Sequence, residues 1–167
     1  DNQGMLIRIN DACCRMLGIQ RSEVMGLYNV MEDNIVADQG RLPLVQSVYA
    51  QGKTVRFLLD YDSSLLQSTP LSQGRHLMLN VTAAPIRDEE GKVTNVIFMH
   101  EDITEQKQFE ARLQNAHDRF QTLVDSLDGL VYAADMETHE ILFINEYGRE
   151  RLGEDLVGQI CWQHLQG

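Results

Sequence analysis

Apolar and polar residues alternate along the middle of the chain, and this period of two predicts β-strands. Every second position of segment 76–86 is apolar, so one strand face would carry Leu77, Leu79, Val81 and Ala83. A β-rich run covers 54–61, and a returning strand covers 93–101. The turn residues Asp88-Glu89-Glu90-Gly91 lie just before that strand and predict a hairpin.

Helical spacing replaces alternation within residues 37–51, where apolar side chains recur at Leu44, Val45, Val48 and Tyr49. Pro43 suits the first turn of such a helix, and Gly52 suits its end.

A pattern near the start of the chain returns near its end. Segment 6–18 reads LIRINDACCRMLG, and segment 141–153 reads ILFINEYGRERLG. Each predicts a short strand, an Asn that caps a short helix, and a Gly that ends it. A generic strand–helix corner without common ancestry is the alternative.

A third pattern starts at Asp102. With Asp102 as the N-cap of a helix and Glu105 three residues later, the sequence resembles a capping box. Apolar residues then follow at alternating intervals of four and three, the seam of a coiled coil: Phe109, Leu113, Ala116, Phe120, Leu123 and Leu127. We expect a parallel dimeric helix over 105–127. An amphipathic helix packed on its own chain is the alternative.

Composition narrows the classes of function. The formal net charge of −11 disfavours nucleic-acid binding and direct membrane contact. No apolar run is long enough to cross a bilayer, and the three cysteines form no framework, which fits the cytoplasm. A start at Asp1 without Met suggests a piece of a longer protein. No phosphate loop, activated nucleophile or carboxylate pair indicates catalysis in this fragment.

The order of these elements resembles the PAS fold, and AAPIRDEEGKV followed by HEDITEQK (83–107) resembles the family's C-terminal PAC-type signature. The resemblance implies an α+β fold: a five-stranded antiparallel sheet with flanking short helices around a small cavity. It divides the chain into a PAS domain over 1–104, the signalling helix over 105–127, and the N-terminal part of a second PAS domain over 128–167.

The same resemblance implies a sensor in a bacterial signalling protein, such as a sensor histidine kinase or a cyclic-di-GMP enzyme (a diguanylate cyclase or phosphodiesterase). A small ligand would bind in the cavity, and the dimeric helix would relay its presence to an output domain beyond the fragment. A ligand-free dimerisation and protein-interaction module is the alternative.

Eight side chains are candidates for the pocket: His100, Phe98, Leu79, Val81, Phe57, Leu59, Val45 and Met16. His100 would supply a polar group, although an imidazole bonded only to its own chain is the alternative. The relay would pass through Asp102, Ile103 and Thr104.

The identity of a cofactor stays open. A b-type haem is disfavoured because the helix within 37–51 has no His. Photoactive flavin is disfavoured because Asn10-Asp11-Ala12-Cys13-Cys14-Arg15, which looks superficially like the flavin motif, lies on the first helix. A metal site from His76, His100 and cysteines lacks ligand spacing.

The family's first strand is missing before Asp1, whereas in the second unit it corresponds to Leu130–Ala134. Without it the strand over 93–101 would leave backbone groups unpaired. Leu130–Ala134 could fill this place, either by folding back or from a partner chain in a domain-swapped homodimer. An independent start of the second domain is the alternative.

Overall fold

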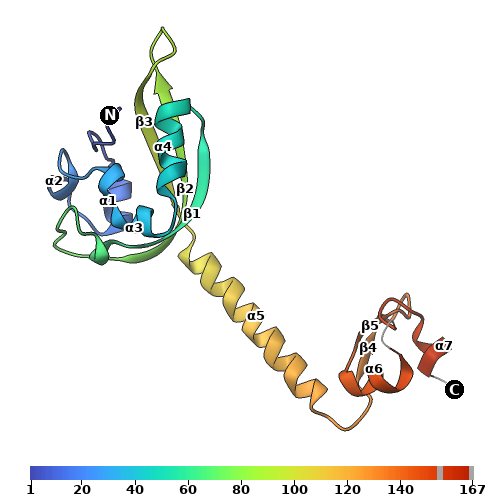
Figure 1. Cartoon of the computed structure of the whole chain (residues 1–167). Coiled ribbons are helices and arrows are strands. Elements are labelled where there is room, and N and C mark those ends of the chain that lie inside the picture. Colours follow the sequence, from blue (N-terminus) through green and yellow to red (C-terminus); the bar gives the residue numbers. More distant parts are fainter. Residues whose placement is uncertain (154–155, 166–167) are drawn as a thin grey trace. The chain divides into compact units, whose positions relative to one another are not determined.

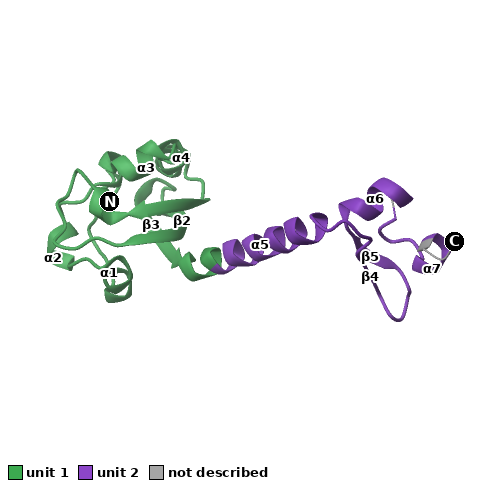
Figure 2. Cartoon of the chain, turned by 90° about the horizontal axis from the view of Figure 1, so that it is seen from below, with its two compact units in different colours: residues 1–108 green, residues 109–167 purple. Residues whose placement is uncertain are grey.

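The computed structural model describes residues 1–153 and 156–165 of the chain. It divides into two compact units, Asp1–Gln108 and Phe109–Gly167 (Figure 2). No helix in the described residues is long and apolar enough to cross a membrane.

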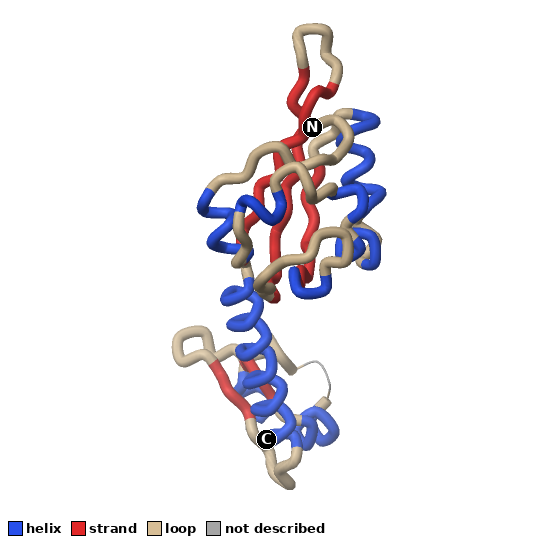
Figure 3. The backbone as a smooth tube through the Cα atoms, turned by 90° about the vertical axis from the view of Figure 1, so that its left-hand side faces the viewer, coloured by secondary structure: helices blue, strands red, loops and turns tan. Residues whose placement is uncertain are grey.

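The first unit is built on three antiparallel strands in the order β1-β2-β3, namely β1 (Val55–Asp62), β2 (His76–Arg87) and β3 (Val93–Asp102) (Figure 3). The alternation predicted for β2 is confirmed, since Leu77, Leu79, Val81 and Ala83 are all buried. The predicted hairpin is confirmed too: the carbonyl of Asp88 accepts from the Gly91 amide, and Gly91 has a φ of 81°.

Short helices precede the sheet: α1 (Asp11–Leu17), α2 (Arg21–Val24), the 3₁₀ turn η1 (Val30–Glu32), α3 (Asn34–Asp38) and α4 (Leu42–Gln51) (Figure 1). A further turn, η2 (Ser63–Leu65), follows β1. As predicted, Asn10 caps α1 by accepting from the Cys13 amide at 2.8 Å, and Gly18 ends the helix at a φ of 70°.

The helix expected within 37–51 is α4, which begins at Leu42 after a turn at Gly40. It buries Val45 and Val48 and contacts all three strands of the sheet. The core of the unit therefore lies between α4 and the inner sheet face.

The five-stranded sheet expected here is not what the structure shows: the first unit has three paired strands. Segment 6–10, expected as a strand, is held through Leu6, which donates to the carbonyl of Tyr28 and accepts from the amide of Gly26. Met5 adds an isolated bridge to Asn29. With this segment bonded to the loop before η1, β3 is an edge strand among the described residues.

The second unit contains most of α5 (Thr104–Asp125), followed by β4 (Tyr132–Ala134), β5 (Ile141–Ile144), α6 (Glu146–Leu152) and α7 (Cys161–Leu165). β4 pairs with β5, so the predicted strand at 130–134 forms within its own unit. Completion of the first sheet by a partner chain stays a prediction. Ile141, Ile144 and Leu156 form this unit's buried core.

Candidate ligand cavity and relay junction

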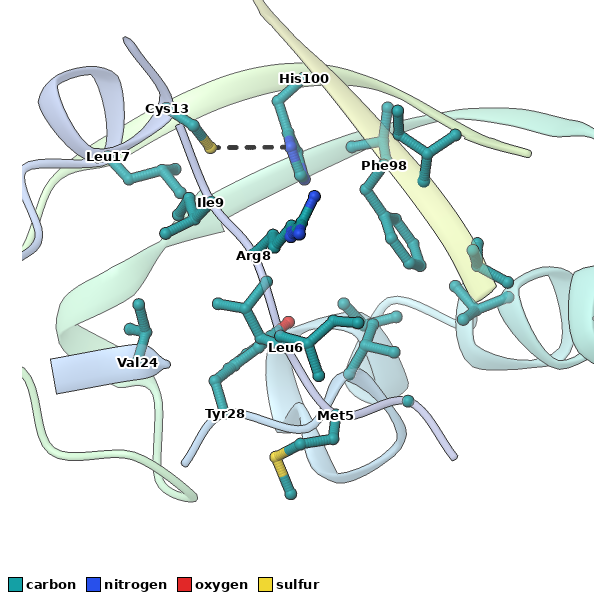
Figure 4. Close-up of a pocket in the computed structure, with 18 of the residues that line it drawn as sticks. Met5, Leu6, Arg8, Ile9, Cys13, Leu17, Val24, Tyr28, Phe98 and His100 are labelled. Carbon is teal, nitrogen blue, oxygen red and sulfur yellow. Dashed lines mark hydrogen bonds between the residues drawn. The ribbon is translucent and has the colours of Figure 1, made fainter. Parts of the chain in front are cut away.

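A cavity of about 870 Å³ lies in the first unit, between the inner face of the sheet, the short helices and segment 4–10 (Figure 4). The sheet contributes mostly apolar side chains to its wall, and α3 and α4 contribute Val36, Val45 and Tyr49. Such a concave, mainly apolar space with a few polar groups is the usual form of a small-molecule site.

Seven of the eight predicted pocket residues line this cavity: His100, Phe98, Leu79, Val81, Phe57, Leu59 and Val45. Met16 does not; it is half-buried and packs against the hydrophobic core. That the seven bind a ligand stays a prediction.

Another part of the cavity wall was not predicted from the sequence, and it is formed by Leu6, Arg8, Ile9, Cys13, Tyr28 and Tyr61. Segment 6–10 was interpreted only as a strand, so its side chains were not considered. A signal was present, because Arg8 is a lone cation inside the apolar run Leu6-Ile7-Arg8-Ile9.

His100 is the titratable residue that β3 presents to the cavity, which Asn95 of the same strand also lines. Its ring stacks with Phe98, with centroids 6.3 Å apart, and its Nδ1 lies 4.0 Å from Cys13 Sγ. Burial lowers the pKa of His100 and raises the pKa of Cys13, whose neighbour Cys14 raises it further. The pair is therefore a neutral imidazole beside a neutral thiol at neutral pH.

A buried carboxylate supports the opposite side of the cavity. Asp33 is fully buried, and its Oδ2 accepts from the hydroxyls of Tyr28 at 2.6 Å and Tyr61 at 3.1 Å. Its Oδ1 accepts from the amides of Ile35 and Val36 and so caps α3. Burial is the largest cause that raises the pKa of both tyrosines, followed for Tyr61 by the Asp33 charge.

The predicted relay residues form a bonded junction between β2, β3 and α5. Ile103 donates its amide to the carbonyl of Met78, and Met78 donates its amide to Thr104 Oγ1, both at 2.9 Å. Asp102 Oδ1 accepts from the amide and the hydroxyl of Thr104. α5 begins at Thr104, so Asp102 lies two residues before the helix rather than at the expected N-cap position.

The strand pairing of β2 and β3 places this junction next to residues that line the cavity. Val81 pairs with His100, and Leu79 pairs with Asp102. The cavity-lining His100 is thus only two positions before Asp102, the side chain that orders the start of α5.

All six predicted seam residues on and just after α5 are exposed, with Phe109 and Leu123 each 68% exposed. Phe120 also contacts Phe143 of β5 within the second unit, with ring centroids 6.1 Å apart. The exposed apolar seam fits the predicted helix pair, which stays a prediction.

The far end of α5 is fixed by Asn145, which is fully buried. Its Nδ2 donates to the carbonyls of Val124 and Gly129, and its Oδ1 accepts from the amides of Val131 and Gly148. One side chain therefore joins the end of the helix to β4, to the end of β5 and to α6.

Within 1–153 and 156–165, no group of three or more His, Cys, Asp and Glu residues is placed to hold a metal ion. His76, considered for such a site, instead pairs with Asp60, and both side chains are exposed.

Comparison with protein-family models matches the description "PAS fold" to residues 1–103, which is more than half of the chain. The chain belongs to the PAS family. A second model, described as "PAS domain", matches residues 118–167. PAS domains are sensory rather than catalytic modules, and the α+β arrangement described above fits that class.

Two solved structures are among those similar to the chain. An RNA-binding Light-Oxygen-Voltage receptor is 24% identical with a TM-score of 0.47, and the alignment covers 68% of this chain and 31% of that one. A Vibrio cholera VqmA–ligand–DNA complex is 21% identical with a TM-score of 0.41, covering 66% and 49%. The chain thus spans less than half the length of either. The search of curated proteins finds no match.

Proposed function

We propose that this chain is the sensory region of a bacterial signalling protein and that it binds a small molecule in the cavity of its first unit. The observation that carries the proposal is the short path from that cavity to the helix. His100 faces the cavity, Asp102 lies two residues further on the same strand, and Thr104 is bonded to both Asp102 and β2.

A ligand that presses on His100 or Leu79 acts on the strand pair that holds Ile103 and Thr104. Any shift of β2 against β3 changes the two bonds at Met78, and with them the direction in which α5 leaves the sheet. Paired α5 helices of a cytoplasmic homodimer would carry that change to an output domain, such as a histidine kinase or a cyclic-di-GMP enzyme.

The alternative is a ligand-free dimerisation module, and the exposed seam of α5 favours it on its own. In that case the chain serves to pair two protomers through α5, and the cavity binds no ligand.

Native mass spectrometry of chain 1–167, purified without denaturation, separates the two. A dimer that carries a small molecule supports the sensor, and an empty dimer supports the dimerisation module. A monomer without bound ligand contradicts both.

A further inference from the structure

Arg8 is a cation at the wall of a mainly apolar cavity (Figure 4). Figure 4 shows its guanidinium directed toward His100. Within the described residues it has neither a carboxylate partner nor a hydrogen bond. Arg8 is exposed, so its guanidinium is hydrated and open to a charged group that enters the cavity from solvent.

The other polar groups at the cavity wall are already bonded or neutral. Asp1 is the one carboxylate that lines it, and its Oδ1 accepts from the amides of Gln3 and Met5. The hydroxyls of Tyr28 and Tyr61 both donate to Asp33. Asn10, Tyr49, Ser63 and Asn95 add neutral polar groups to the wall, and among the described lining residues Arg8 is the one cationic side chain, beside the neutral imidazole of His100.

We propose that the ligand of this cavity is an amphiphile with a carboxylate head, which binds the Arg8 guanidinium beside His100, and an apolar body against the sheet. A guanidinium presents a planar pair of N–H donors that matches a carboxylate. One arginine balances one negative charge, and the apolar body contacts Phe57, Leu59, Leu79 and Val81. This inference rests on the proposed sensor function and names the ligand class.

The test uses decanoate and decanol, which share an alkyl chain and differ in the charge of the head. Isothermal titration calorimetry on chain 1–167 should give decanoate an affinity at least about tenfold higher than decanol. Arg8→Gln should remove most of that difference and leave decanol binding unchanged. Arg15→Gln makes the same change of charge on α1, outside the cavity lining, and should leave both affinities unchanged.

Equal binding of decanoate and decanol by the unmodified chain would overturn the inference, as would equal effects of Arg8→Gln and Arg15→Gln. Binding of neither probe would also overturn it. A failure of the sensor function itself would be seen in a different experiment, as a native mass spectrum in which the chain carries no small molecule. Circular dichroism checks that both variants fold.

Discussion

The amide of Met78 donates to the hydroxyl of Thr104 across 2.9 Å, which joins the middle strand of the sheet to the first residue of α5. Leu79, the next residue of that strand, lines the cavity. Because the same hydroxyl donates to Asp102, the loss of one oxygen atom removes two bonds at the junction.

Thr104→Val should therefore loosen the junction and leave the shape of the side chain almost unchanged. We expect a stability loss of about 1–2 kcal/mol and at least about tenfold faster hydrogen exchange at the Met78 amide. Thr122→Val is the matched control, since the Thr122 hydroxyl bonds only within exposed α5, to the carbonyl of Asp118. Equal rates of hydrogen exchange at the Met78 amide in both variants would contradict a stabilising role of the Thr104 hydroxyl at the junction.

The Asp33 carboxylate should be a main determinant of the stability of the first unit. Asp33→Ala leaves two tyrosine hydroxyls and two amides without their acceptor, and we expect a loss of about 3 kcal/mol or more by urea unfolding. Tyr28→Phe removes a single bond to a charged group and should lose about 1.5–3 kcal/mol. A cost for Asp33→Ala no larger than that for Tyr28→Phe would disprove the network.

The seam of α5 can be tested by placing a charge in it. Leu113→Glu should weaken dimerisation at least about tenfold, because it puts a carboxylate at a buried seam position of the expected pair. Gln121→Glu makes the same change of charge on the same helix outside the seam and should have little effect. Analytical ultracentrifugation measures both, and identical dissociation constants would mean that the helix pairs through another face or not at all.

His100 should make stability depend on pH in a definite direction. Its pKa is lowered from 6.5 by burial, so the unfolded chain binds a proton more readily than the folded one. Stability is then fully present above pH 6.5 and is lost as the pH falls toward the lowered pKa of the folded state.

When the pH falls from about 7.5 to 5.5, the free energy of unfolding should therefore decrease less for His100→Leu than for the unmodified chain. Urea unfolding at both pH values measures this. Because His76 has a raised pKa from its bond to Asp60, the comparison is made between variants rather than on one curve. An equal decrease in the free energy of unfolding for both proteins would show that burial does not lower the pKa of His100.

Much of the first unit could be predicted because its signals are local. The alternation of β2, the Asn10 cap and the turn at Gly91 each depend on a few neighbouring residues, and all three are confirmed. Six of the seven predicted cavity residues lie on strands, where parity alone decides which side chains share a face, and Val45 follows from helical spacing in α4.

The rest depends on contacts between distant residues. Segment 6–10 has a strand-like sequence, yet Leu6 bonds to the loop at Tyr28, and that pairing decides where Arg8 lies. The Asp33 network joins Tyr28, Asp33 and Tyr61 from three elements and leaves no periodic signal. Met16 was wrongly placed because Cys13 and Leu17 are the residues of α1 that line the cavity, whereas Met16 packs against the hydrophobic core.

The bonds of the Asn145 side chain all close short loops, reaching back 21 residues to Val124, 16 to Gly129 and 14 to Val131. Short loop closure is fast and carries a small entropic cost. All four partners of the Asn145 side chain lie within residues 124–148, so these bonds themselves use no residue that is synthesised after Gly148. The helix would acquire its downstream anchor early, independently of what any later domain does.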